Sequence, residues 1–70
     1  MLLSSIEVKQ AEKIASEFLR QKYSNIIVEK SVLEDDGRVW LVEVSVSLFD
    51  KEKKITVRVN ARTGSILGWE

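Results

Sequence analysis

A near-strict alternation of apolar and polar residues runs through VWLVEVSVSLF, residues 39–49. Side chains two residues apart point to the same face of a β-strand. The alternation therefore predicts a long strand with one core face, which must pair with neighbours and be covered. The predicted core-facing side chains are Trp40, Val42, Val44, Val46 and Leu48.

The segment KITVRVNA, residues 54–61, repeats this alternation after the polar stretch DKEK, residues 50–53. DKEK is predicted to be the hairpin loop between the two strands. The register should match the two apolar faces, because a slip of one residue would turn one apolar set outward. The expected pairs are Leu48 with Ile55, Val46 with Val57, Val44 with Val59, and Val42 with Ala61.

The N-terminal part of the chain has helical rather than strand periodicity. A capping box from Ser4 to Glu7, with Leu3 packed on Val8 as a hydrophobic staple, predicts a helix that starts at Ser5 and ends near Tyr23. Its apolar face combines Val8, Ala11, Ile14, Ala15, Phe18 and Leu19.

Residues 26–34 form the first expected strand, which joins the next through the DDG turn at Asp35, Asp36 and Gly37. A two-residue turn would send Leu33 and Ile27 inward, but also Glu29. A three-residue turn would send Val32, Val28 and Ile26 inward, but also Lys30. Each alternative misplaces one charge, so we expect a β-bulge in this strand or an end that lies beyond the helix.

The C-terminal segment NARTGSILGWE contains one residue that adopts a positive φ at little cost, Gly64. We expect a type I turn through residues 61–63, closed by a glycine bulge. This turn places Leu67 opposite Val59 and Trp69 opposite Val57, on the core face. An even loop would instead turn Ile66 inward and leave Trp69 outside.

These elements predict one α+β domain over residues 1–70, with an N-terminal helix packed on a curled antiparallel four-strand meander. The chain has no Cys and no His, so its 44% of apolar residues must build the core, and self-association as a homodimer is one way to supplement it. The charges of eleven basic and eleven acidic side chains cancel. The chain therefore lacks the broad positive electrostatic field that attracts nucleic acids. With no leader-like or membrane-spanning stretch, we expect a cytoplasmic protein.

The stretch from Asn60 to Ile66 resembles the Asp-Ala-x-Thr-Gly-x-apolar ending of PepSY domains, in which Asn60 replaces the usual Asp. The resemblance extends from about Val8 to Leu67. It implies a cystatin-like arrangement of one helix across a curled antiparallel sheet. It also implies binding and inhibitory roles, as in the propeptides of thermolysin-type peptidases.

Catalytic chemistry is poorly supported, because the commonest general base and the best thiol nucleophile are both missing. The carboxylates of Glu34, Asp35 and Asp36 are typical of a solvated hairpin turn. A weak calcium site is the alternative, although the EF-hand spacing is absent. We therefore predict no enzyme activity and no catalytic, cofactor-binding or metal-binding residues.

Two surfaces are candidates for binding. Val39, Leu41 and Phe49 are expected on the outer face of the strand formed by residues 39–49, with Val32 beside Leu41. Trp69 is either core or interface, and the last strand could accept a strand from a partner at residues 65–70. These features predict a non-enzymatic protein-interaction or regulatory module that binds through the outer sheet face or an edge strand. Inhibition of the bound partner is one form of such regulation.

The alternative function is nucleic-acid binding. Lys54, Arg58 and Arg62 are spaced to form a basic stripe on the outer face of the strand formed by residues 54–61. No aromatic side chain stands beside this stripe to stack on bases. A solvated polar face is the simpler interpretation, so a protein partner is favoured over nucleic acid.

Overall fold

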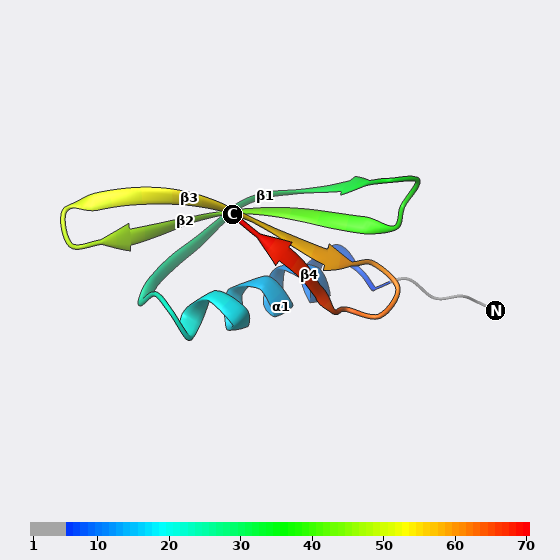
Figure 1. Ribbon diagram of the computed structural model, residues 1–70, viewed down its shortest axis with the longest axis horizontal. Helices are drawn as coiled ribbons and strands as arrows, with labels where there is room; N and C mark the ends of the chain where they lie inside the picture. The colour runs from blue at the N-terminus through cyan, green and yellow to red at the C-terminus, as the bar shows by residue number, and fades with distance from the viewer. Residues whose placement is uncertain (1–5) are drawn as a thin grey trace.

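The computed structural model describes residues 6–70 of the chain. One helix, α1 (Val8–Arg20), precedes four strands: β1 (Asn25–Glu34), β2 (Val39–Leu48), β3 (Lys51–Asn60) and β4 (Ile66–Trp69). The strands form one antiparallel sheet in the order β1-β2-β3-β4, and α1 lies across one of its faces (Figure 1). The predicted fold class, a helix on a four-strand meander, is confirmed.

The core lies between α1 and the inner face of the sheet. Ala11, Ala15 and Leu19 are fully buried on α1 and follow one another at intervals of four residues, so they lie on one side of the helix. The two alanines have small side chains and let the helix approach the sheet closely. The fully or almost fully buried sheet residues are Val42, Val44, Val46, Ile55, Val57 and Val59, with Ala61 just past β3.

The helix begins at Val8, later than the predicted start at Ser5, with Glu7 as its N-cap. The Glu7 backbone N–H is 2.9 Å from Oε1 of Gln10, to which it donates. Ile6 instead packs against the core, and its N–H donates to the carbonyl of Ala61, just past β3, over 2.7 Å. The predicted contacts of Leu3 and Ser4 lie outside the described residues.

The register of β2 against β3 differs from the prediction, although the faces do not. Val44 pairs with Ile55, Val42 with Val57, and Trp40 with Val59. Residues 51–53, predicted to be loop, extend β3, and the strands are joined by a two-residue turn at Phe49 and Asp50. The shift is an even number of residues, so each strand keeps its apolar side chains on the inner face.

The expected bulge in β1 is present and resolves the two turn alternatives. Val28 pairs with Val44, while Lys30 pairs with Glu43, so Glu29 is the extra residue. Neither charge is misplaced, as the expected bulge implied, because the extra residue reverses the alternation. Ile26 and Val28 pack toward the core, while Glu29 and Lys30 contact outer-face groups on Ser45 and Glu43.

The last hairpin confirms the role of Gly64, which has φ of +83°. Trp69 lies opposite Val57 as predicted, but Ile66, not Leu67, lies opposite Val59. The ladder is irregular at this point, and Leu67 is 52% exposed. This bulge lets both Ile66 and Trp69 turn toward the helix side, which neither sequence alternative foresaw.

Candidate protein-binding surface

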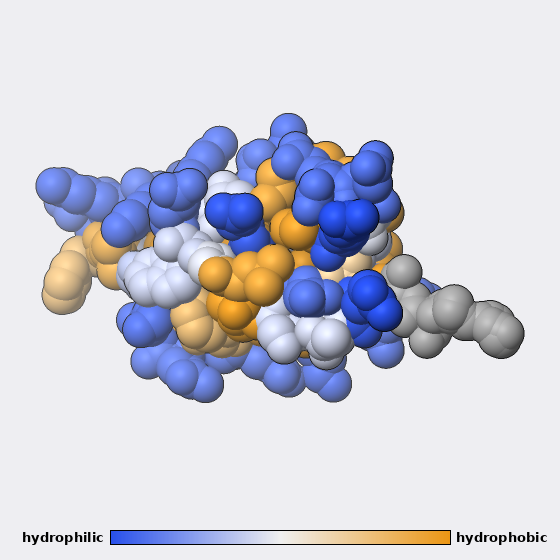
Figure 2. All heavy atoms as spheres, turned by 45° about the vertical axis from the view of Figure 1, so that its right-hand side comes forward, coloured by the Kyte–Doolittle hydropathy of each residue, from blue (hydrophilic) through white to orange (hydrophobic). Residues whose placement is uncertain are grey.

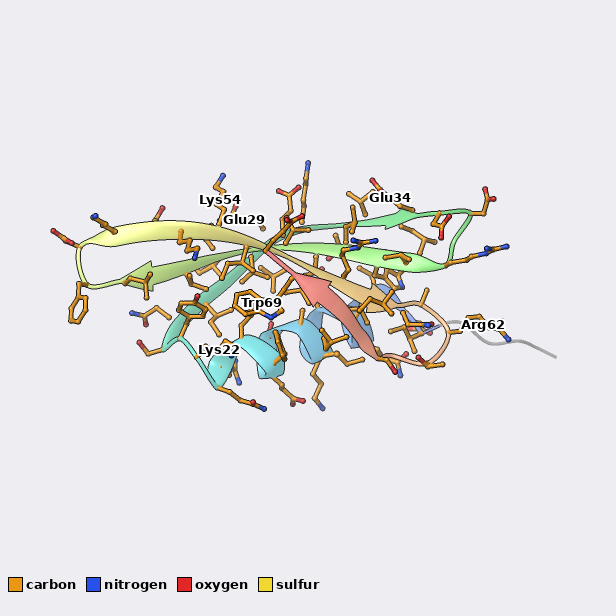
Figure 3. All side chains as sticks on the ribbon, viewed as in Figure 1. Lys22, Glu29, Glu34, Lys54, Arg62 and Trp69 are labelled. Carbon is orange, nitrogen blue, oxygen red and sulfur yellow. The ribbon has the colours of Figure 1, made fainter. Side chains whose placement is uncertain are left out.

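The sheet face opposite α1, here called the outer face, carries two of the predicted interface residues. Val39 and Leu41 are partly buried on β2, and Leu41 pairs with Val32 of β1, which is 38% exposed. Figure 3 shows Glu29, Glu34 and Lys54 on this same side of the sheet, away from the helix. The outer face therefore combines an apolar patch with charged surroundings.

A shallow depression, here called the outer hollow, forms around this patch. Its lining residues come from β1, β2 and β3, from the β1–β2 turn and from the residue after β4. They are Glu34, Asp35, Val39, Leu41, Thr56, Arg58 and Glu70. Glu70 reaches it because its backbone exchanges hydrogen bonds of 2.9 and 3.1 Å with Thr56. Three carboxylates and one guanidinium thus surround two aliphatic side chains.

Arg58 enters the outer hollow because of the β2–β3 register. The predicted register places Arg62 opposite Leu41, whereas the structure places Arg58 there. Thr56 and Arg58 were not predicted at the protein interface, and Glu70 was included only in the edge predicted to accept a strand, residues 65–70. The sequence signal for Thr56 and Arg58 was the polar alternation of β3, which says that a side chain faces outward but not what lies beside it.

Phe49 does not join this patch. It lies in the β2–β3 turn, just past the end of β2, with φ of +56° and a fully exposed ring. That turn and the β1–β2 turn, which contributes Asp35 to the outer hollow, lie at opposite ends of the sheet (Figure 1). A single contact surface centred on Leu41 would therefore not include Phe49.

Trp69 faces the helix and not the outer face. Its ring meets that of Phe18 edge-on at 5.9 Å, and Nζ of Lys22 stands 5.3 Å from the Trp69 ring centroid. The side chain is still 39% exposed. Trp69 therefore packs on Phe18 of the helix and keeps part of its surface accessible, while its role in an interface stays a prediction.

The three predicted basic residues do not form one stripe. Lys54 lies opposite Ser45, on the part of β3 that β4 does not cover, and Arg58 lies among the carboxylates of the outer hollow. Arg62 follows β3 and belongs to the turn before β4, well apart from Lys54 in Figure 3. The outer face carries charges of both signs, including a Lys30–Glu43 pair at 3.7 Å.

The acidic DDG segment forms the β1–β2 turn. Asp35 and Asp36 both have left-handed backbone conformations, and the carbonyl of Glu34 accepts hydrogen bonds from the N–H groups of Gly37 and Arg38. Asp is among the residues that tolerate this conformation. Among residues 6–70, no group of three or more acidic side chains is arranged to hold a metal ion.

Asn60, the residue at the start of the family-like motif, organises the β3–β4 turn. Its Oδ1 accepts hydrogen bonds from the N–H groups of Arg62 at 2.8 Å and Thr63 at 3.1 Å. Its carbonyl accepts a third, of 2.8 Å, from the N–H of Gly64. A carboxylate could accept the same bonds, so these contacts explain why Asn can stand where the motif has Asp.

The fold and the outer face together describe a small helix-on-sheet domain with an apolar patch surrounded by charges. The family described as "Peptidase propeptide and YPEB domain" matches residues 5–70, so the chain belongs to the PepSY family, as the motif predicted. No curated protein and no solved structure matches the chain. Within residues 6–70, no helix has the length and apolar character needed to cross a membrane.

Proposed function

We propose that this chain is a non-enzymatic regulatory module that binds a protein partner through the outer hollow. Membership of a family described by peptidase propeptides supports a peptidase as that partner. Binding that covers a peptidase's substrate site would make the module inhibitory. We also propose a cytoplasmic location, which cell fractionation tests directly.

The observation that carries this proposal is the position of Val39 and Leu41 between charged groups. An apolar centre with a polar rim is the usual arrangement of a protein interface. In the outer hollow, Val39 and Leu41 can contact an aliphatic side chain of the partner. Glu34, Asp35 and Glu70 can accept hydrogen bonds from a basic group, and Arg58 can donate to a carboxylate or carbonyl.

The outer face is favoured over the free edge of β4 as the binding surface. β4 has only four residues, and one of them is displaced by the bulge at Leu67. A short, irregular edge offers few consecutive backbone groups to an added strand. The outer hollow instead combines side chains from three strands with Asp35 and Glu70.

The test is inhibition of a thermolysin-type peptidase, together with pull-down of partners at low and high salt. We expect the double variant Val39→Ser/Leu41→Ser to lose inhibition and binding, while Phe49→Ser, at the far turn, keeps both. Circular dichroism must show that both variants are folded. Equal loss in the two variants, or full activity of the double variant, would exclude the outer hollow as the binding surface.

A further inference from the structure

The two edges of the sheet carry different side chains. Beyond the part of β3 that pairs with β4 and Glu70, its open edge runs through Lys51, Glu52, Lys53 and Lys54, all exposed. Charged side chains, lysine above all, discourage strand addition. The edge strand β1 instead exposes Ile27 at 62% and Leu33 at 47%. Strand addition is therefore favoured at β1.

The backbone of β1 has free capacity along its outer edge. The strand has ten residues and pairs on one side only, with β2. Within the part of the chain that the structure describes, backbone hydrogen bonds outside the helix and the strand pairs do not involve residues 25–33. An added strand could use the backbone groups that point away from β2.

The bulge at Glu29 determines which strand fits. Before the bulge, Ile26 and Val28 face the helix side and Ile27, opposite Ser45, faces outward. After the bulge, the alternation between the helix side and the outer face is shifted by one residue. Ser31 faces the helix, where its hydroxyl donates to Glu12 at 2.8 Å, and Val32 faces outward beside Leu41. A regular strand would match one half of β1 and mismatch the other.

We propose that a second copy of this chain supplies the added strand, with the two β1 strands antiparallel and a two-fold axis between Glu29 and Lys30. A second copy carries the same bulge at the same place, so the faces match along the whole strand. In this register the two residue numbers of every pair add up to 59. The pairs are Asn25–Glu34, Ile26–Leu33, Ile27–Val32, Val28–Ser31 and Glu29–Lys30.

This self-pairing is chemically complementary. Ile27 meets Val32 on the outer face and Ile26 meets Leu33 on the helix side, so the exposed aliphatic side chains of β1 cover one another. Glu29 meets Lys30 twice across the axis. An isologous two-fold contact of this kind is the commonest symmetry of homo-oligomers. The result is a continuous eight-strand sheet with both outer hollows on one face.

The test uses charge reversal on the two central residues at low ionic strength. In Glu29→Lys, lysine faces Lys30 of the second copy, and in Lys30→Glu, glutamate faces Glu29. Each variant alone should self-associate about tenfold more weakly than wild type, because two attractive pairs become two repulsive pairs. Mixing the two variants restores two attractive pairs and should restore the dimer. Sedimentation velocity measures the mass, from 8.0 kDa toward twice that value.

The matched control is Lys54→Glu, the same charge reversal on the other edge, which should dimerise like wild type. Circular dichroism melts confirm that every variant is folded, because Glu29 and Lys30 also contact Ser45 and Glu43. A wild-type chain that stays monomeric at all concentrations overturns the proposal. So does a dimer that tolerates both single reversals, or a mixture that stays monomeric. A strand captured from another protein at β1, without self-association, also overturns it.

Discussion

Trp69 and Phe18 join the last strand to the helix through an edge-to-face contact, with ring centroids 5.9 Å apart and ring planes inclined at 68°. Edge-to-face rings are a favoured aromatic geometry. Lys22 adds its ammonium over both rings, at 5.3 Å from Trp69 and 5.9 Å from Phe18. This small cluster holds β4, a strand of four residues, at the edge of the sheet.

Trp69→Ala should therefore lower the free energy of unfolding by about 2 kcal/mol, below the roughly 3–5 kcal/mol of a fully buried tryptophan, because the ring is 39% exposed. Urea denaturation followed by circular dichroism measures the change. Phe49→Ala, at the fully exposed ring, is the control and should stay within about 0.5 kcal/mol of wild type. Equal effects at the two positions would contradict the cluster's role.

Gly64→Val should destabilise the fold by about 1–3 kcal/mol. Gly64 has φ of +83°, and a Cβ built on it would stand 3.0 Å from Cδ1 of Ile14. Gly68→Ala is the control, since a Cβ at Gly68 meets nothing within 4 Å. The denaturant midpoint should fall for Gly64→Val and change little for Gly68→Ala. An unchanged midpoint for Gly64→Val would refute the turn geometry.

Asn60→Ala should cost about 1 kcal/mol, because the N–H groups of Arg62 and Thr63 lose the side-chain oxygen that accepts from both. Asn60→Asp should retain most of the stability, since a carboxylate accepts the same two bonds. Thermal unfolding of the two variants at neutral pH compares them. If Asn60→Asp lowers the stability as much as Asn60→Ala, the two hydrogen bonds accepted by Oδ1 do not account for the contribution of Asn60.

Trp40 should be the more sensitive of the two tryptophans. Its Nε1–H donates to the carbonyl of Ile6 over 3.1 Å, and its ring packs against the core from the inner face. Trp40→Phe should cost about 1 kcal/mol for the lost hydrogen bond, and Trp40→Ala about 3–5 kcal/mol. Urea midpoints test both values. A stable, cooperatively folding Trp40→Ala chain would argue against an inner-face position.

Local patterns predicted much of this fold. The alternation in residues 39–49 and 54–61 correctly assigned the inner-face valines of β2 and β3, because side-chain direction in a strand has a period of two. The spacing of Ala11, Ala15 and Leu19 marked the buried side of α1. The need for positive φ at Gly64 and for a bulge in β1 also followed from the residues nearby.

Long-range registers were decided by the tertiary structure. Alternation cannot distinguish a two-residue turn at Phe49 and Asp50 from the predicted four-residue loop at residues 50–53, because an even shift keeps every side chain on its face. That shift exchanged Arg62 for Arg58 beside Leu41 and so changed the composition of the outer hollow. Likewise, Val39 and Leu41 were predicted on the outer face, but their charged neighbours were not.

Local sterics and the period of side-chain direction were enough to predict the fold class, the faces of the strands and the places where glycine or a bulge is required. They did not predict which residues stand opposite one another, where Trp69 packs or what surrounds Leu41. These contacts join residues far apart in the chain, and their free energy depends on the packing of all the strands and the helix together.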